Sequence, residues 1–168
     1  MKKIAVIGPE SSGKSTLSKE LAQAIDGHWV PEYARLYLEE NGPDYDEKTV
    51  EVIGKGQLKL EAKAAEKAQD SWVVCDTDLM VIKVWMQYKY NSYPNWIDEK
   101  LDKNTLYLLC KPDMPWEPDP LRENPFDRLE IYSFYRNLLK KSGYQFIDLE
   151  GTVEERIEKS KSFISNFQ

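Results

Sequence analysis

The sequence predicts an α/β fold in which a five-stranded parallel sheet is covered by helices on both faces. Short apolar runs alternate along the chain with amphipathic segments, which is typical of such a sheet. The first run is continuously apolar, as in a strand buried on both faces, and a glycine-rich turn joins it to a helix-like segment. The five expected strands are Lys3–Ile7, Trp29–Val30, Trp72–Cys75, Thr105–Cys110 and Gln145–Leu149.

The first two expected helices follow from apolar spacing and composition. From Ser15 to Asp26, leucine, alanine and isoleucine side chains fall on one helical face, and Gly27 provides a stop. From about Glu47 to Gln69 the chain is rich in Ala, Glu, Lys and Leu, which favours a helix. Because Gly54 and Gly56 interrupt this segment, it is compatible with a kink or with two separate helices.

Cap residues mark the ends of the three later helices. Asp78 is the expected N-cap of a helix over Leu79–Tyr90. Asn124 and Pro125 are expected to start the next helix, which stops at Gly143. Thr152 and Glu155 form a capping box at the start of the last helix.

Composition and charge place the chain among soluble globular proteins. Its 168 residues suffice for one domain, 1–168, with 41% hydrophobic and 31% charged residues. The net charge of −6 argues against a general nucleic-acid binder, whose surface carries excess positive charge. No apolar run is long enough for a membrane span and no signal peptide is evident, so we expect a cytoplasmic protein with no membrane partner.

The few histidine and cysteine residues limit the kinds of catalytic, metal and redox site that the chain can form. His28 is the only histidine, which argues against Ser-His catalysis and His-rich metal sites, and we expect it in a loop or at a strand edge. Cys75 and Cys110 lie in apolar strand-like runs. Two buried thiols in a reducing compartment are therefore expected, and a disulfide or redox pair is the less favoured alternative.

The segment from Gly8 to Thr16 matches the phosphate-binding motif G-x-x-x-x-G-K-[ST] between a strand and a helix. Its glycines permit a tight turn, its N–H groups point at the β-phosphate, and the helix N-terminus adds positive character. We expect Lys14 to reach the β- and γ-phosphates of ATP, Ser15 to bind Mg²⁺ and Thr16 to contact the α-phosphate. The alternative is a chance match in a solvated turn. The other expected nucleotide-binding residues here are Gly8, Glu10, Ser11, Ser12 and Gly13.

Polar side chains follow the second and third strands, where ligands collect in a doubly wound sheet. Glu32 is placed to accept a proton from a substrate hydroxyl or to hold that hydroxyl, and its alternative is a surface acid beside Arg35. Asp76 is expected to bind Mg²⁺ through water. An alternative role for this aspartate, as a helix N-cap, fits Asp78 better.

Two arginines flank a polar, proline-rich segment, Lys111–Glu123, whose length is typical of functional loops. Arg122 lies inside it and Arg128 just past it, where they would neutralise charge on a transferring phosphoryl group. Solvated surface charge is the alternative for either one. Trp85 is among the aromatic residues expected near the ligand, where a ring can stack on a flat heterocycle. Gly151 follows the fifth strand, where its backbone meets the adenine or simply forms a turn.

Four segments, GPESSGKSTL, VPEYAR, CDTD and MPWEPDPLRE, resemble in order and spacing the ribosylnicotinamide kinase domain of the NadR family and its stand-alone, AAA-type relatives. The resemblance extends from Lys3 to about Glu155. It implies a P-loop kinase fold with an arginine-bearing lid, and transfer of the γ-phosphate of ATP, with Mg²⁺, to the 5′-hydroxyl of nicotinamide riboside. Carried over residue by residue, it implies phosphate and Mg²⁺ roles for Lys14, Ser15 and Asp76, a lid role for Arg122, and riboside contacts for Glu32, Tyr33, Arg35, Gln57 and Asp78.

The segments expected to cover the substrate, Tyr37–Gln57 and Leu79–Asp102, match that family poorly, so the acceptor is open. One alternative is a kinase for another nucleoside or for a nucleoside monophosphate, whose extra negative charge Arg35, Lys55 and Lys59 would meet. The other is a regulatory nucleotide-binding module with feeble ATPase activity and no small-molecule acceptor. In the kinase mechanism, either Glu32 or Asp78 orients the acceptor hydroxyl.

Overall fold

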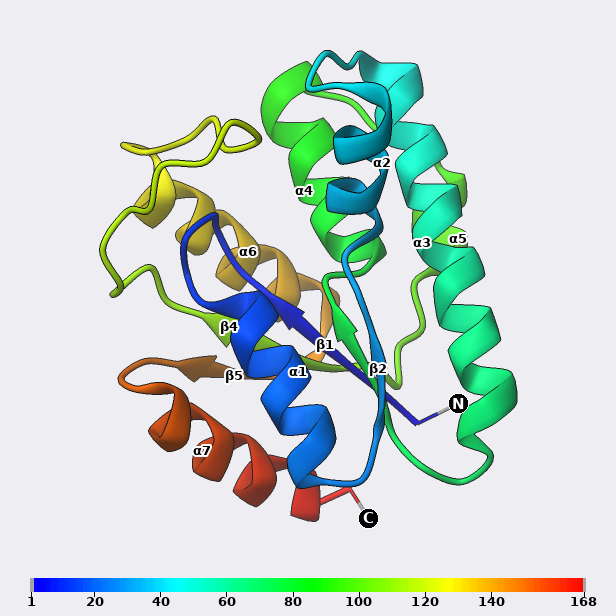
Figure 1. The fold of residues 1–168 in the computed structure, drawn as a ribbon, viewed down its shortest axis with the longest axis vertical. Helices are drawn as coiled ribbons and strands as arrows, with labels where there is room; N and C mark the ends of the chain where they lie inside the picture. The colour runs from blue at the N-terminus through cyan, green and yellow to red at the C-terminus, as the bar shows by residue number, and fades with distance from the viewer. Residues whose placement is uncertain (1, 168) are drawn as a thin grey trace.

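The computed structural model describes residues 2–167, so that Met1 and Gln168, the ends of the expected domain, lie outside the described residues. Its centre is a five-stranded, all-parallel sheet in the order β2-β3-β1-β4-β5, with helices on both faces (Figure 1). The predicted sheet is therefore confirmed. The strands are β1 Lys3–Ile7, β2 His28–Val30, β3 Val73–Asp76, β4 Leu106–Cys110 and β5 Gln145–Leu149.

Seven helices are found within the described residues, and they divide between the two faces of the sheet. The α1 and α7 helices pack together on one face, and α3 to α6 supply most of the apolar side chains on the other (Figure 1). The helices are α1 Lys14–Ala24, α2 Tyr33–Asn41, α3 Glu47–Ala68, α4 Leu79–Tyr90, α5 Trp96–Lys100, α6 Arg128–Ser142 and α7 Val153–Ser165.

The central strand β1 shows how one apolar run supplies two cores. Successive side chains of a strand point to opposite faces. Ile4 and Val6 pack in the core shared with α1 and α7, whereas Ala5 and Ile7 pack in the core shared with α3 to α6. Because helices cover both faces, the strand is apolar throughout rather than alternating with polar residues.

The sequence patterns did not predict α2 or α5, and the division of α3 was wrong. The α3 helix runs uninterrupted over 22 residues. Its glycines serve side-chain packing instead, because a Cβ on Gly56 would lie 2.0 Å from the ring of Tyr33, and one on Gly54 would lie 3.2 Å from Ile82. The α2 helix depends on this close approach to α3, which is a tertiary contact that no local pattern carries.

The start of α6 also differs from the prediction, because the helix begins at Arg128 and Asn124 is not its N-cap. The backbone N–H of Asn124 instead donates to the Glu10 carboxylate at 2.8 Å, which holds this residue in the preceding loop. The other predicted caps are confirmed. Asp78 accepts a hydrogen bond from the N–H of Met80, and a capping box starts α7.

His28 is the first residue of β2, at an edge of the sheet. Cys75 and Cys110 are buried and unpaired, as expected for two structural thiols. Within residues 2–167, no helix has both the length and the apolar character that crossing a membrane requires.

Candidate active site

The turn between β1 and α1 has the backbone conformation that its glycines permit. Gly8 and Gly13 have φ values of +144° and +78°, in the region that favours glycine. A Cβ on Gly8 would lie only 2.6 Å from the carbonyl oxygen of Cys110. Lys14 Nζ donates to the carbonyl oxygen of Pro9 at 2.8 Å, so the ammonium group already lies across the turn.

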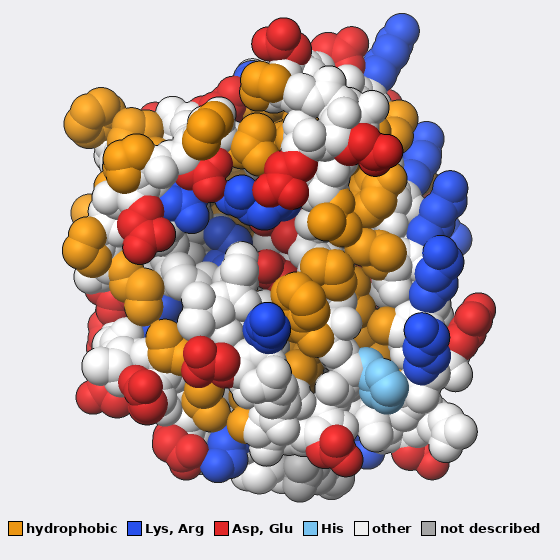
Figure 2. All heavy atoms as spheres, in the orientation of Figure 1, with side chains coloured by type: hydrophobic (Ala, Val, Ile, Leu, Met, Phe, Trp, Pro, Cys, Tyr) orange, Lys and Arg blue, Asp and Glu red, His pale blue; other side chains and the backbone are white. Residues whose placement is uncertain are grey.

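A cavity of about 620 Å³ opens beside this turn, which is large enough for a nucleotide-sized ligand. In Figure 2 a hollow faces the viewer, with basic and acidic side chains visible at its depth. Its walls come from the phosphate-binding loop, α2, α4, α6 and the segment before α6. The predicted site residues that line it are Gly8, Glu10, Ser11, Ser12, Gly13, Lys14, Ser15, Thr16, Glu32, Arg35, Trp85 and Arg122.

Asp76 ends β3 opposite Val6 of β1 and lies behind the cavity lining, where it is 2% exposed. Burial raises the pKa of its carboxyl group, and the neighbouring Ser15 hydroxyl and the Lys14 ammonium oppose that rise. Its Oδ1 atom has no hydrogen-bond partner among the described residues. A bound ion or a water molecule can satisfy a buried polar atom of this kind.

The residues around Asp76 fit a magnesium ion. Mg²⁺ in kinases is held by one or two protein oxygens, while substrate phosphates and water complete its shell. Asp76 and the Ser15 hydroxyl provide such oxygens next to the expected phosphates. No group of three or more His, Cys, Asp or Glu residues in the described chain forms a metal site by itself. The donor set therefore suits a metal that arrives with a nucleotide.

Glu32 occupies the N-cap position of α2 and lines the cavity. Burial raises the pKa of this carboxyl group to about 7, and the negative charge of Asp76 adds to the rise while Lys14 and Arg35 oppose it. A carboxyl group that titrates near neutral pH is well suited to accept a proton. Glu32 is therefore the candidate general base.

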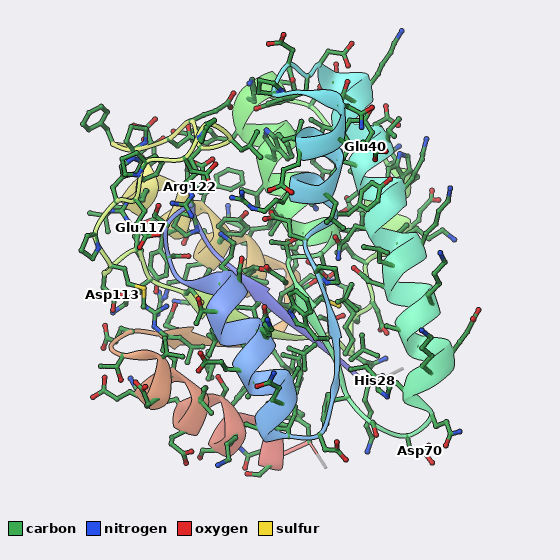
Figure 3. All side chains as sticks on the ribbon, viewed as in Figure 1. His28, Glu40, Asp70, Asp113, Glu117 and Arg122 are labelled. Carbon is green, nitrogen blue, oxygen red and sulfur yellow. The ribbon has the colours of Figure 1, made fainter. Side chains whose placement is uncertain are left out.

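The segment 111–127 between β4 and α6, which we call the lid, lies against the phosphate-binding loop. Arg122 Nη1 donates to Ser11 Oγ at 2.9 Å and lines the cavity. The Glu10 carboxylate accepts the backbone N–H groups of Glu123 at 3.1 Å and Asn124 at 2.8 Å. Figure 3 shows Arg122 at the tip of the loop after β1. The lid thus covers the phosphate side of the cavity.

Arg128 supports the lid from its base. Its Nη1 donates to the carbonyl oxygens of Ser11 at 3.2 Å and Met114 at 2.9 Å, and its guanidinium lies 5.8 Å from the centre of the Trp116 ring. Arg128 does not line the cavity. Both predicted arginines therefore contact the phosphate-binding loop, but only Arg122 faces the ligand space.

The far wall of the cavity is aromatic and carries paired charges. Trp85 Nε1 donates to Tyr45 Oη at 3.0 Å, and the two rings meet edge to face at 4.8 Å. Lys89 donates to Tyr45 Oη at 2.7 Å and pairs with Glu123 of the lid at 3.1 Å. The lid, α4 and the loop before α3 therefore meet around Trp85.

A second ion pair joins the lid to α2. Arg35 Nη2 lies 2.9 Å from Asp119 Oδ2, so the helix that carries Glu32 at its N-cap is tied to the lid. Arg35 also lines the cavity. Its positive charge is thus shared between the lid and the ligand space.

Two of the residues expected at the riboside lie behind the cavity wall. The Tyr33 ring packs on Gly56 of α3. Gln57, which is 2% exposed, accepts the N–H of Tyr33 at 2.9 Å and donates to the carbonyl oxygen of Thr77 at 3.3 Å. Gln57 therefore links the turn after Glu32 to the turn after Asp76, and its expected direct contact with the riboside does not fit this geometry.

Asp78 likewise makes its contacts inside the protein. It is fully buried, and its Oδ2 atom lies 2.9 Å from Lys3 Nζ and accepts the Tyr107 hydroxyl at 3.1 Å. Burial alone would lower the pKa of Lys3, but the nearby carboxylates of Asp78 and Glu61 raise it above its ordinary value. Of the two carboxylates expected to orient the acceptor, Glu32 lines the cavity and Asp78 does not.

Gly151 does not line the cavity either. Its N–H donates to Asp113 Oδ2 at 2.7 Å, and its carbonyl oxygen accepts from Arg156 Nε at 3.1 Å. The expected adenine contact through this amide is therefore not supported, and the alternative of a turn before the α7 cap fits the structure.

Sequence reasoning missed three residues around the site: Tyr45, Lys89 and Arg156. Tyr45 and Lys89 come from segments with no recognisable motif, and no local signal would have found them. Arg156 carries a signal, because it stands in the buried row of α7 with Ser160 and Ile164, at helical spacing. A charged residue at such a position requires a buried partner.

Known proteins resemble this chain over most of its length. The model of the AAA domain family AAA_28 matches residues 3–156. The trifunctional NAD biosynthesis/regulator protein NadR of Escherichia coli (strain K12) is 26% identical over 159 residues, which cover 88% of this chain and 38% of that protein. The NadR protein of Salmonella typhimurium matches equally, at 26% identity. The chain thus spans well under half the length of these curated relatives.

Solved structures share the fold. A NadR protein in complex with NR superposes with a TM-score of 0.78 at 20% identity, covering 99% of this chain and 50% of that one. The deoxyadenosine kinase from M. mycoides with bound dATP gives a TM-score of 0.60 at 16% identity, covering 98% of this chain and 100% of that one. The fold is therefore that of the P-loop kinases. By the match over residues 3–156, the chain belongs to the AAA domain family AAA_28.

Proposed function

We propose that this protein is a kinase that transfers the γ-phosphate of ATP to the 5′-hydroxyl of a nucleoside, with nicotinamide riboside as the leading acceptor. The observation that carries the proposal is the convergence of two features on one cavity. The phosphate-binding loop lines this cavity, and so does Glu32, a carboxyl group whose pKa is raised to about 7. A phosphate donor and a hydroxyl acceptor can therefore meet there.

The donor is held by the phosphate-binding loop. Backbone N–H groups and the N-terminus of α1 bind the phosphates, and Lys14 leaves the Pro9 carbonyl oxygen for the β- and γ-phosphates. Ser15 and Asp76 would hold Mg²⁺, which neutralises charge on the phosphate oxygens when it is bound. Arg122, already at Ser11, is within the lid that covers this end.

The transfer step needs a base beside the acceptor hydroxyl. Glu32 takes the hydroxyl proton as the acceptor oxygen forms a bond to the γ-phosphorus. The bond between that phosphorus and the β,γ-bridging oxygen breaks, and ADP leaves with the electron pair. Lys14 and Arg122 stabilise the negative charge on the transferring group. The closed lid excludes water, which would otherwise compete with the acceptor.

The acceptor assignment rests on chemistry and on the relatives. Nicotinamide riboside carries a flat, positively charged ring, and Trp85 and Tyr45 offer aromatic surface to such a cation. A similar structure is in complex with NR, and the curated relatives are NAD biosynthesis proteins. These features favour this nucleoside over other acceptors.

A nucleoside monophosphate is a weaker candidate for the acceptor. Its phosphate would need free positive charge, but Lys89 is paired with Glu123 and Arg35 with Asp119. Lys55 and Lys59, the other cations considered from the sequence, are exposed on α3 and do not line the cavity. A regulatory ATPase module would use the same carboxylate to orient water, so dependence on an acceptor is what separates it from a kinase.

A coupled assay of ADP release tests the proposal. Purified protein with MgATP is offered nicotinamide riboside, adenosine, deoxyadenosine, nicotinamide mononucleotide, or no acceptor. We expect the fastest release with nicotinamide riboside and little without an acceptor. Equal release with and without every acceptor would identify an ATPase and contradict the proposal. Preferred release with nicotinamide mononucleotide would support the monophosphate alternative instead.

A further inference from the structure

Arg156 of α7 is a fully buried arginine with four partners around its guanidinium group. Nη1 donates to the carbonyl oxygen of Ser12 at 2.6 Å, and Nε donates to that of Gly151 at 3.1 Å. Nη2 pairs with the Asp113 carboxylate and lies 3.4 Å from the carbonyl oxygen of Lys111. Arg156 therefore contacts three loops at once: the phosphate-binding loop, the loop after β5 and the start of the lid.

The contact with Ser12 bears directly on phosphate binding. In a trans peptide unit, the carbonyl of one residue and the N–H of the next point in opposite directions. Arg156 holds the Ser12 carbonyl on the α7 side, so the N–H of Gly13 is turned away from α7. Gly13 lines the cavity. The arginine thus restrains the peptide whose N–H group belongs to the phosphate-binding set.

Asp113 extends this restraint to the lid. It lies at the start of the lid (Figure 3) and receives both Arg156 and the N–H of Gly151, the latter at 2.7 Å. The next residue, Met114, packs closely on Gly13: a Cβ on Gly13 would lie 2.9 Å from the sulfur atom of Met114. The root of the lid and the phosphate-binding loop are therefore held against one another around Arg156.

We propose that Arg156, paired with Asp113, is a positioning residue that holds the phosphate-binding loop in its nucleotide-binding conformation and ties it to the root of the lid. The proposal rests on the proposed function only in that the loop binds a nucleotide. Without the guanidinium group, the Ser12–Gly13 peptide is free to rotate, and part of the binding energy is spent on reordering it. Nucleotide affinity falls although Arg156 does not line the cavity.

The test measures binding of an unreactive ATP mimic, AMP-PNP with Mg²⁺, by isothermal titration calorimetry. Four proteins are compared: wild type, Arg156→Met, Arg156→Lys and Arg136→Met. Arg136 is the control for loss of an arginine–carboxylate pair, because it pairs with Asp148 at 2.9 Å, at a more exposed position, and contacts no part of the phosphate-binding loop. Circular dichroism melting of each variant fixes a temperature at which all are folded.

We expect Arg156→Met to raise the dissociation constant of AMP-PNP about tenfold or more. Arg156→Lys should recover part of the loss, because an ammonium group can still donate to one carbonyl oxygen, and Arg136→Met should bind like wild type. A folded Arg156→Met protein with an affinity within about twofold of wild type would overturn the proposal. A purely structural role would lower the melting temperature and leave the affinity of the folded protein unchanged.

A second variant covers the case in which Arg156→Met does not fold. Asp113→Asn keeps an oxygen for the Gly151 N–H but removes the charge opposite Arg156. We expect it to weaken AMP-PNP binding about threefold or more, and wild-type affinity would overturn the proposal. If the wild-type protein itself fails to bind AMP-PNP, the proposed kinase function fails as well, so the two failures are distinguishable.

Discussion

The two sides of the cavity are built in different ways. The phosphate side comes mainly from one unbroken turn, in which residues 8–16 follow β1 and run into α1. The acceptor side is assembled from distant segments, since Tyr45 meets Glu123 across 78 positions and Lys89 across 44. The phosphate side is therefore a property of a local sequence, whereas the acceptor side is a property of the folded chain. This division suits a kinase family in which the phosphate donor is shared and the acceptor differs between members.

Asp76→Asn should give the largest effect on the phosphate side. The amide cannot supply the anionic oxygen that suits Mg²⁺, so kcat should fall about 10³-fold. AMP-PNP affinity without the acceptor should change only a few-fold, because the loop and Lys14 still hold the phosphates. Steady-state kinetics and calorimetry measure the two quantities, and full activity in this variant would remove Asp76 from the mechanism.

Asp78→Asn sharpens the comparison, because this aspartate is only two residues away but contacts Lys3 and Tyr107 and does not line the cavity. It leaves the buried ammonium group of Lys3 with one fewer carboxylate, which should cost about 3 kcal/mol of unfolding free energy. Urea unfolding measures this loss. At a temperature where the variant is folded, its kcat should stay near that of wild type, and a selective loss of kcat would instead return Asp78 to the active site.

Glu32→Gln should lower kcat about 10²-fold, since the amide cannot take the acceptor proton. In the wild type, kcat/KM for the acceptor should rise with pH through about 7, because the carboxyl group must be ionised to act. The same raised pKa makes the folded protein bind the proton more tightly, so Glu32 lowers stability as pH rises from 4.5 towards 7. A pH profile that keeps its rise in Glu32→Gln would assign it to another group.

Lys89→Met should have a smaller effect, confined to the acceptor side. Losing the Lys89 contacts with Tyr45 and Glu123 loosens the wall around Trp85, so KM for the nucleoside should rise about fivefold with KM for ATP unchanged. Lys59→Met, an exposed lysine outside the cavity, is the control and should change neither constant. A rise in both KM values for Lys89→Met would show that the two sides are not separable.

The sheet and the position of the phosphate-binding loop beside a cavity could be predicted from the sequence, because both follow from local rules. Each signal lies within one short segment: the apolar run of β1, the two glycines of the motif, Gly8 and Gly13, and Asp76 at the end of a buried strand. The position of Gln57 could not be predicted in this way. Its role depends on Tyr33 and Thr77 meeting across two other elements. The packing of α2 against Gly56 also depends on the folded chain, and no residue spacing within α2 predicts it.

The most direct measurement of the central claim follows the γ-phosphate itself. ATP labelled with ³²P at the γ position is incubated with nicotinamide riboside and either wild type or Lys14→Ala, and the products are separated by chromatography. We predict that the label appears in nicotinamide mononucleotide with wild type, and that Lys14→Ala loses this transfer. Label released only as inorganic phosphate, or equal transfer by Lys14→Ala, would contradict the account.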